Sequence, residues 1–227
     1  MKRSVDHRTR VGQARSARTQ IRIVEAALRV FAERGPDAPV IDDFVAAAGV
    51  ARGTFYNHFK SVEELLDATS EWTTMQVNQS IAHAMAGLED PTLRLGVGMR
   101  LFFARAQGDP VWCRFVARVW KLGGLELPLR DVDAGIRLGE FRVPGRDAAH
   151  ALLLGGVRDA LQRIADRRMP PSFGDEMAEI YLRALGAEPR RIAAALAHEL
   201  PLLPERAPLA AHPQGARAAR APTRRAR

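Results

Sequence analysis

Apolar side chains recur along this chain at intervals of three and four residues, which is the spacing of one face of an α-helix. The first such stretch ends at Gly35-Pro36, a helix stop signal, and its apolar face comprises Ile21, Val24, Leu28 and Phe31. No stretch shows a convincing two-residue alternation of the kind that β-strands need. The pattern therefore predicts an all-α protein of about ten helices.

Two shorter helical segments follow the first. In one, Ile41 and Phe44 face inward and Gly49 closes the segment, while Phe55 and Phe59 lie four residues apart in the other. A glycine suits a tight turn between helices because it adopts the left-handed conformation without strain. Three short helices with a glycine turn before the third indicate a helix-turn-helix, whose third helix enters the major groove of DNA.

Glycine and proline mark the ends of the later helices. Ser61, three residues before Glu64, forms a capping-box pattern that opens a long helix. Beyond it we expect helix boundaries at Asp90-Pro91, Gly108-Asp109-Pro110, Gly123-Gly124, Pro144-Gly145, Pro170-Pro171, Gly186 and Pro189. The expected fold is a small helix-turn-helix domain followed by a larger helical bundle.

Residues 44–66, FVAAAGVARGTFYNHFKSVEELL, resemble the signature of the TetR/AcrR family of transcriptional regulators. The shared features are the Ala-Ala-Gly-Val turn, the Gly-Thr-aromatic-Tyr helix, the His-Phe pair and the Lys-Ser-x-Glu-Glu-Leu segment. The resemblance is close over residues 18–66 and weaker toward the end, where LRALGAEP and PLLP resemble the last helices of family members. It implies a cytoplasmic homodimer that binds a palindromic operator on double-stranded DNA. It also implies a small organic effector, so we expect a repressor that a small apolar ligand releases.

The candidate DNA-binding residues lie on the exposed side of the third helix, opposite Phe55 and Phe59. Arg52 suits guanine or phosphate, and hydroxyl and amide side chains suit base edges or phosphate. Gly53 lies inside the predicted third helix, where a glycine lowers stability by about 1 kcal/mol relative to alanine. Close approach of the backbone to DNA is one reason for a glycine at this position. The set comprises Arg52, Gly53, Thr54, Tyr56, Asn57, His58 and Lys60.

Two positions depart from the family pattern. Val40 and Ala51 stand where family members usually have Ser or Thr, so the second and third helices each lack a hydroxyl cap. Asp42 and Asp43 favour the dipole of the second helix but oppose phosphate. Residues 21–66 sum to a net charge of −2, which makes the motif alone a weak electrostatic DNA binder.

The basic residues of the chain are concentrated at its two ends. Residues 1–20 and residues 205–227 each carry a net charge of +5, within a total of +8. We expect residues 1–17 to be a flexible basic arm that binds DNA, residues 18–66 the helix-turn-helix domain, residues 67–204 the ligand-binding and dimerisation domain, and residues 205–227 a disordered tail. The alternative is that both ends are merely solvated, which suits the Ala/Arg/Pro-rich tail better than the arm.

Five of the fourteen aromatic residues fall within residues 102–120. Two interpretations are open: bundle core, which the composition favours, or the lining of an effector pocket, which the family resemblance implies. The candidate ligand-binding residues are Phe102, Phe103, Trp112, Phe115 and Trp120. Cys113, the only cysteine, fits a reducing compartment and a buried apolar role better than a redox sensor.

The segment from Arg146 to Arg168 is apolar almost all round in its first half. We expect it to form the dimer interface together with the helix that carries Ile180, with Gly155-Gly156 allowing close approach of the partner. The alternative is the central helix of a monomeric bundle. His150 lies one turn from Asp147, and we expect these two to pair on the helix surface.

Other function classes lack their motifs in this sequence. There is no GxSxG elbow, P-loop or GxGxxG motif for an enzyme, no His or Cys spacing for a metal, and no implied cofactor. The N-terminus lacks the apolar region of a signal peptide, no apolar run is long enough to cross a bilayer, and the basic ends are too interrupted for a membrane-surface helix.

Overall fold

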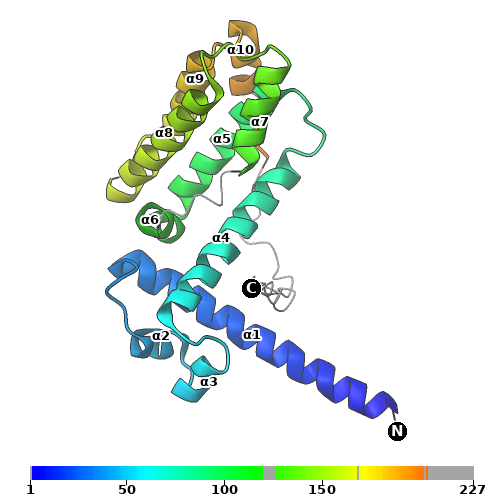
Figure 1. The fold of residues 1–227 in the computed structure, drawn as a ribbon, viewed down its shortest axis with the longest axis vertical. Helices are drawn as coiled ribbons and strands as arrows, with labels where there is room; N and C mark the ends of the chain where they lie inside the picture. The colour runs from blue at the N-terminus through cyan, green and yellow to red at the C-terminus, as the bar shows by residue number, and fades with distance from the viewer. Residues whose placement is uncertain (1, 120–125, 168, 202, 204–227) are drawn as a thin grey trace, which may run out of the picture.

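The computed structural model describes residues 2–119, 126–167, 169–201 and 203 of the 227-residue chain. These residues form helices and no strand, which confirms the all-α prediction. A small N-terminal unit lies at one end of the molecule and a helical bundle at the other, and one long helix, α4, leads from the first to the second (Figure 1).

The N-terminal unit comprises α1 (Lys2–Arg34), α2 (Ile41–Ala48) and α3 (Arg52–Tyr56), and α4 spans Val62–Ala84. The bundle comprises α5 (Pro91–Gly108), α6 (Pro110–Val119), α7 (Glu126–Arg137), α8 (Arg146–Asp166), α9 (Phe173–Ala184) and α10 (Pro189–Ala197). The expected boundaries agree with these elements, except that Gly123-Gly124 lies outside the described residues and that α1 begins earlier than expected.

Side-chain and glycine caps set the helix ends where the sequence contains their signatures. Gly49 ends α2 with a φ of 60°, the left-handed conformation that a glycine adopts without strain. Ser61 begins α4, because its side chain accepts a hydrogen bond from the Glu64 backbone N–H at 3.1 Å. Asp90 likewise accepts from the Leu93 backbone N–H at 2.9 Å and begins α5.

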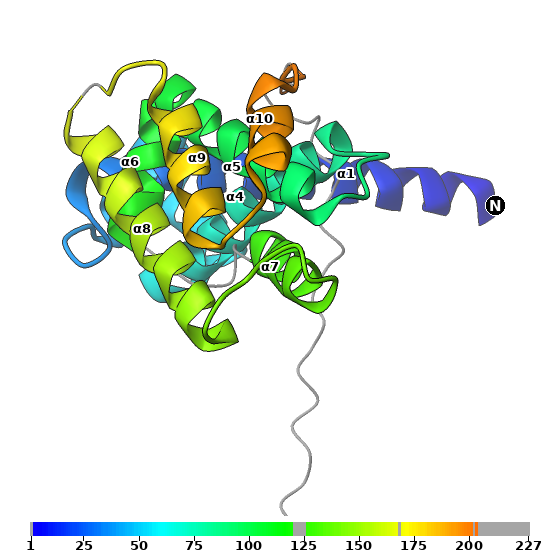
Figure 2. The same cartoon turned by 90° about the horizontal axis from the view of Figure 1, so that it is seen from above.

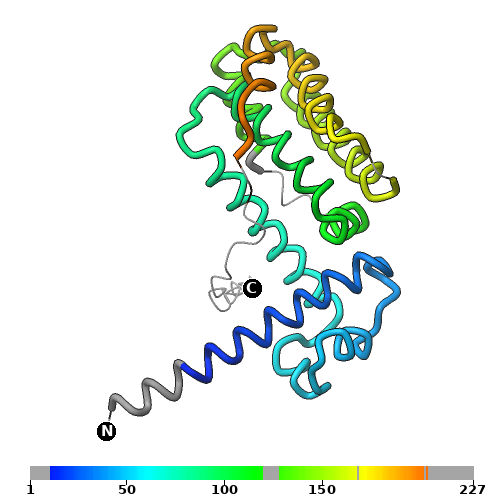
Figure 3. Tube along the Cα trace, turned by 180° about the vertical axis from the view of Figure 1, so that it is seen from behind, coloured from blue at the N-terminus to red at the C-terminus, as the bar shows by residue number. Residues whose placement is uncertain are grey.

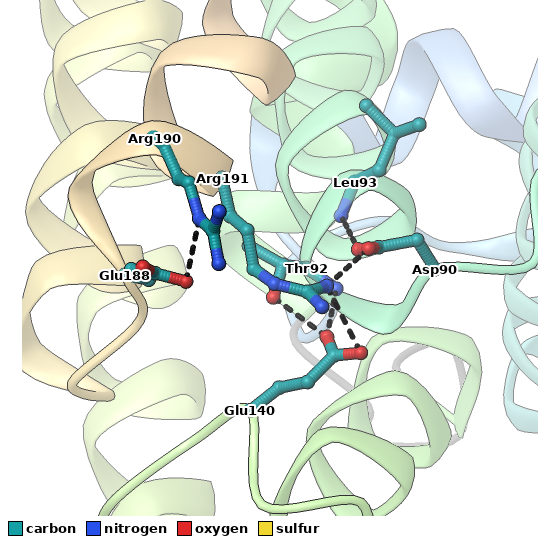
Figure 4. Close-up of polar contacts among 7 residues, drawn as sticks. All are labelled: Asp90, Thr92, Leu93, Glu140, Glu188, Arg190 and Arg191. Carbon is teal, nitrogen blue, oxygen red and sulfur yellow. Dashed lines mark hydrogen bonds and ion pairs between the residues drawn. The ribbon is translucent and has the colours of Figure 1, made fainter.

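A polar cluster joins the last helix to the start of α5 (Figure 4). Arg191 of α10 contacts the carboxylates of both Asp90 and Glu140, with a separation of 3.0 Å from its NH1 atom to Glu140 Oε1. Glu140 also accepts a 2.8 Å hydrogen bond from the Thr92 hydroxyl. These contacts join three segments far apart in sequence and so fix the end of the bundle that lies away from the N-terminal unit.

Two apolar cores meet at α6. Phe31, Phe44 and Phe55 are fully buried in the core of the N-terminal unit, and the rings of Phe31 and Phe44 are 4.9 Å apart. Phe115 of α6 also belongs to this core, with its ring 6.3 Å from that of Phe31. Trp112, on the same helix, is buried in the core of the bundle instead. Helix α6 therefore contributes to both cores.

The expected flexible arm is the N-terminal half of a helix. Helix α1 begins at Lys2 and continues without a break to Arg34, so the prediction that residues 1–17 are flexible is wrong for residues 2–17. Residues 13–18 contain alanine, glutamine and arginine, which favour helix, and no proline interrupts the segment. Seen from above, this half of α1 leads away from the body of the molecule (Figure 2), and residues 11–17 do so in the view from behind (Figure 3).

Two expectations about α8 are also corrected. His150 pairs with Asp133 of α7, with 2.8 Å between Nε2 and Oδ1, rather than with Asp147 on its own helix. A Cβ atom at Gly156 would lie 1.5 Å from the hydroxyl of Tyr181, so this glycine accommodates α9 of the same chain and not a partner subunit. A Cβ at Gly155 would have no heavy atom within 4 Å. The two adjacent glycines thus face different surroundings.

We predict that Gly156→Ala destabilises the protein by about 1–3 kcal/mol, because the buried Tyr181 ring must move to admit the methyl group. Gly155→Ala is the matched control and is expected to be neutral or to stabilise by up to about 1 kcal/mol, the gain in helix propensity. Urea unfolding of both variants measures the difference. Equal stabilities would contradict the observed packing of Tyr181 on Gly156.

Candidate nucleic-acid interface and regulatory cavity

Two buried aromatic side chains hold α3 on the N-terminal unit. Phe55 is fully buried and Phe59 is 2% exposed, and their ring centroids are 6.0 Å apart. Burying both rings fixes one side of this five-residue helix and the turn after it against the core. The other side, which begins with Arg52, faces solvent.

The seven predicted DNA-binding residues lie in and just after α3. Of these, Arg52, Gly53, Tyr56, Asn57 and Lys60 are exposed, while Thr54 and His58 are half-buried. The helix ends at Tyr56, so three of the seven residues, Asn57, His58 and Lys60, lie in the turn into α4. A Cβ at Gly53 would have no heavy atom within 4 Å, so the chain itself gives no packing reason for this glycine.

Arg52 is held from two sides on this surface. Its NH1 atom lies 2.7 Å from Oδ1 of Asp42, and its guanidinium carbon lies 5.9 Å from the centroid of the Tyr56 ring. Arg52 and Asp42 are both more than half exposed, so the ion pair is weak and an incoming anion can replace it. The guanidinium is thus available for a phosphate or a guanine base.

The missing hydroxyl caps are confirmed, and Asp43 takes over part of their role. Neither Val40 nor Ala51 forms a side-chain cap. Oδ2 of Asp43 accepts the Val40 backbone N–H at 2.9 Å, and Oδ1 accepts Arg34 at 2.7 Å. The hydrogen bond from Val40 and the charge of Arg34 lower the pKa of Asp43. Both acidic residues of α2 therefore have a cationic partner, which offsets their repulsion of phosphate.

His58 adds no charge to this surface at neutral pH. Partial burial lowers the pKa of His58 below its usual value, because desolvation disfavours the charged imidazole. Its ring is 6.4 Å from that of Phe59. A neutral imidazole can still donate or accept a hydrogen bond at a base edge.

A cavity of about 40 Å³ lies inside the bundle. It is lined mainly by residues of α4, α5, α7 and α8, it is partly open to solvent, and most of its lining is apolar. The lining residues are Asn78, Ile81, Met85, Arg94, Leu95, Gly98, Met99, Phe102, Phe103, Pro128, Asp131, Leu153 and Val157. This space is the candidate effector site.

The structure brings only part of the predicted aromatic set to this cavity. Phe102 and Phe103 line it, and Trp112 lies directly behind Phe102 in a T-shaped contact with ring centroids 5.4 Å apart. Phe115 is placed elsewhere, in the N-terminal core, because its side of α6 faces α1. Trp120 lies outside the described residues.

Three polar lining residues were not predicted from the sequence. Arg94 of α5 and Asp131 of α7 form an ion pair at 2.8 Å, and Asn78 of α4 lies in the same lining. The paired residues are 37 positions apart and belong to no local motif. The near-complete burial of Asp131, 7% exposed, appears only when the helices are assembled.

Cys113 is buried, and burial raises the pKa of its thiol to about 12. Thiolate is the reactive form of cysteine, so the thiol is inert near neutral pH. Within the described ranges no group of His, Cys, Asp and Glu residues is placed to hold a metal ion. None of the described helices combines the length and the apolar character needed to cross a membrane.

Comparison with known sequences finds relatives through the N-terminal unit. Residues 23–69 match the family model of bacterial regulatory proteins, tetR family. The HTH-type transcriptional repressor DhaR of Mycobacterium sp. (strain GP1) is 49% identical over 49 residues, 21% of this chain and 25% of that protein. The HTH-type transcriptional regulator CymR of Pseudomonas putida is 39% identical over 75 residues, 33% of this chain and 37% of that protein. The match therefore spans well under half the length of these relatives.

Comparison with solved structures extends the likeness to the bundle. RolR, solved without ligand, superposes with a TM-score of 0.61 at 24% identity and covers 82% of this chain and 100% of its own. The fatty acid degradation regulator FadR from Bacillus halodurans superposes with a TM-score of 0.63 at 18% identity and covers 74% of this chain and 97% of its own. These TM-scores establish a shared fold. The N-terminal unit therefore matches the tetR family of bacterial regulatory proteins over residues 23–69, and the chain as a whole shares the fold of these solved regulators.

Proposed function

We propose that this chain is a sequence-specific, DNA-binding transcriptional regulator, a repressor that a small ligand releases from its operator. The observation that carries the proposal is the exposed polar side of α3, which Phe55 and Phe59 hold on the N-terminal unit immediately after the glycine turn. Polar side chains presented by a rigid short helix are what base and phosphate recognition requires. Arg52 and Tyr56 are its best-placed members.

The regulator is proposed to act as a homodimer through α8 and α9, which lie side by side (Figures 1 and 2). Leu152 of α8 and Ile180 of α9 are large apolar side chains that remain 47% and 60% exposed. Around them α8 presents further small exposed residues at helical spacing, namely Ala148, Ala151 and Gly155. A two-fold contact over this face buries apolar surface and places two copies of α3 on successive turns of DNA.

We propose that α6 transmits the effect of ligand binding to the DNA-binding unit. Phe102 lines the cavity and contacts Trp112 of α6, and Phe115 of the same helix packs near Phe31 of α1. Near the end of α6, Arg118 also donates a 2.6 Å hydrogen bond to the Glu33 backbone carbonyl. A ligand that displaces Phe102 therefore moves α6 against α1. Displacement of α1 then alters the spacing of the recognition helices.

Similar proteins support a ligand-responsive role. RolR has been solved in complex with resorcinol, and another structure of this fold is a gamma-butyrolactone receptor. Both ligands are small neutral molecules. DhaR is described as a repressor, which is the mode of action we propose here.

The first test removes the recognition side chains. We expect Arg52→Ala and Tyr56→Ala each to weaken operator binding, and loss of a bidentate Arg–guanine contact alone removes about 1–3 kcal/mol of discrimination. Gel shifts with fragments selected from genomic DNA measure the effect. Arg190→Ala, which removes an 80%-exposed arginine on α10, is the matched control. Unchanged operator affinity in both α3 variants would refute the proposed interface.

The second test addresses the dimer. We expect Ile180→Glu or Leu152→Glu to convert the protein to a monomer at micromolar concentration, because each places a charge in the proposed apolar contact. Sedimentation velocity measures the state. Leu138→Glu, at a 63%-exposed leucine of the loop after α7, is the matched control and should leave the dimer intact. A wild-type monomer that still binds the full operator would exclude this dimer.

The third test concerns the basic half of α1. Residues 2–17 carry five basic residues, Lys2, Arg3, Arg8, Arg10 and Arg15, and Arg15 is exposed. Each phosphate neutralised adds about 0.9 to the slope of log affinity against log salt concentration. If three charges of residues 2–17 are engaged in each subunit, deleting this segment should flatten the slope of a dimer by about five units. Specific and non-specific affinity should both fall.

Deletion of residues 206–227 is the control for the arm, because it removes an even larger net charge, +6 against +4 for residues 2–17, from the other end of the chain. We expect it to change the salt slope little. In Figures 1 and 2 the start of α1 points away from α8 and α9, so the arm should protect DNA on the outer flank of each half-site. Equal slopes for wild type and the arm deletion would show that the arm is only solvated.

A further inference from the structure

The polar atoms of the cavity define the chemistry of its ligand more narrowly than its apolar lining does. Arg94 and Asp131 line the same space and pair with each other, so the charge they bring is balanced. A ligand carboxylate would leave a net negative charge beside the buried Asp131, and a ligand ammonium would leave a net positive one. Burying an uncompensated charge is strongly unfavourable, which excludes both classes.

The Arg94–Asp131 pair retains both a free acceptor and a free donor. Arg94 uses Nε on Asp131 Oδ1 at 2.8 Å and NH1 on the Leu88 carbonyl at 3.0 Å. A guanidinium has five N–H groups, so its NH2 donors remain available with respect to the described residues. Oδ2 of Asp131 likewise accepts no hydrogen bond within the described chain. One hydroxyl group can satisfy both sites, because it donates and accepts.

Two further observations show that the polar groups of the site can accept an additional partner. The Asn78 carboxamide forms no hydrogen bond with any residue that the structure describes. Burial raises the pKa of Asp131 despite the adjacent Arg94, so the guanidinium does not fully offset the loss of water around the carboxylate. A donor supplied by a ligand would compensate this desolvation.

The size of the cavity shows that the ligand must enlarge it. Its volume of about 40 Å³ is well below the roughly 150 Å³ of a protein cavity that accepts benzene. Met85 and Met99 are flexible, and Phe102 is half-buried, so these side chains can yield. Gly98 allows the close approach of Met85, because a Cβ there would lie 3.1 Å from its sulfur.

We infer that the effector is a neutral, largely apolar molecule of about one ring that carries a hydroxyl group, which donates to Asp131 and accepts from Arg94. This inference rests on the proposed function, in which the cavity is the effector site. The ring of the ligand fills the cavity and displaces Phe102 toward Trp112. The hydroxyl group determines which molecules bind, because it forms the hydrogen bonds.

Four probes of similar size distinguish a neutral ligand with a hydroxyl group from an apolar, an anionic and a cationic ligand. They are phenol, toluene, benzoate and benzylammonium. Phenol and toluene differ only in a hydroxyl against a methyl group, and the other two carry the excluded charges. Isothermal titration of the DNA-free protein should give phenol an affinity about ten- to a hundredfold above that of toluene, the effect of a hydrogen bond to a charged group. The charged probes should not bind. Equal or tighter binding of toluene, tightest binding of either ion, or no binding of phenol at millimolar concentration overturns the inference.

Two sets of variants test whether the probe binds in this cavity. The double variant Arg94→Met/Asp131→Leu removes the ion pair as a unit, since loss of one partner alone would strand a buried charge. It should abolish the preference for phenol over toluene.

Asn78→Leu removes no hydrogen bond within the described chain, so it tests the site even where the double variant fails to fold. It should lower phenol affinity several-fold, while Gln79→Leu, at the exposed neighbour on α4, should not. Unchanged phenol affinity in Asn78→Leu, or a preference for phenol that persists in a folded double variant, overturns the site.

Gel shifts with and without phenol distinguish this inference from the proposed function. Selective phenol binding that leaves operator affinity unchanged supports the cavity chemistry and refutes release by this ligand class. Operator binding in a protein that shows no preference for phenol overturns the inference and leaves the DNA-binding function intact.

Discussion

Phe115 is buried in the core of the N-terminal unit although its helix, α6, is part of the bundle. Its ring lies beside Phe31, which in turn contacts Phe44 of α2. The orientation of α2 and of the short helix after it is thus tied to the position of α6. One turn earlier, Trp112 packs in the bundle against Phe102. Because tightly packed interiors resist small displacements and transmit them, α6 cannot move in one core without disturbing the other.

The acidic residues of the helix-turn-helix are arranged so that their charge does not oppose DNA binding. Asp43 caps α2 and pairs with Arg34, while Asp42 pairs with Arg52. Asp43 is thereby engaged by both a backbone hydrogen bond and an ion pair. The second pair holds Arg52 at the start of α3, and under the proposed function DNA competes with Asp42 for it. The net charge of −2 over residues 21–66 therefore overstates the repulsion at the recognition surface, although it leaves little long-range attraction.

Local signals in the sequence predicted most of the fold, and tertiary contacts explain the errors. Gly49, Ser61 and Asp90 end or begin helices through their own backbone freedom or side chain, so their roles follow from sequence alone. The environment of Gly156 depends on Tyr181, and the partner of His150 depends on Asp133. Neither contact lies within one helix, so periodicity could not find it. The predicted recognition residues in and after α3 form a contiguous motif, so the sequence alone groups them, and five of the seven are exposed.

The cavity residues also show which features the sequence alone could predict and which it could not. Phe102 and Phe103 were expected at a ligand site because aromatic residues cluster in the sequence. Arg94, Asp131 and Asn78 come from three helices and become a set only when these pack together. Composition can suggest an apolar pocket, but the groups that give a pocket its selectivity are single residues contributed by different helices.

The energetic demand of release is compatible with a small hydroxyl-bearing ligand. Moving a two-state equilibrium from 1:99 to 99:1 requires about 5.5 kcal/mol of differential binding. A hydrogen bond to a charged group supplies about 1.5–3 kcal/mol. At about 25 cal/mol per Å² the remainder corresponds to roughly 100–160 Å² of apolar surface, which is about the area that one aromatic side chain buries. Because the cavity is too small for a ring in the present conformation, nearly all of this energy is realised only in the enlarged one. Under the proposed function, the contracted cavity therefore couples ligand binding to the movement of α6, since a ligand can shift the equilibrium only by its difference in affinity for the two states.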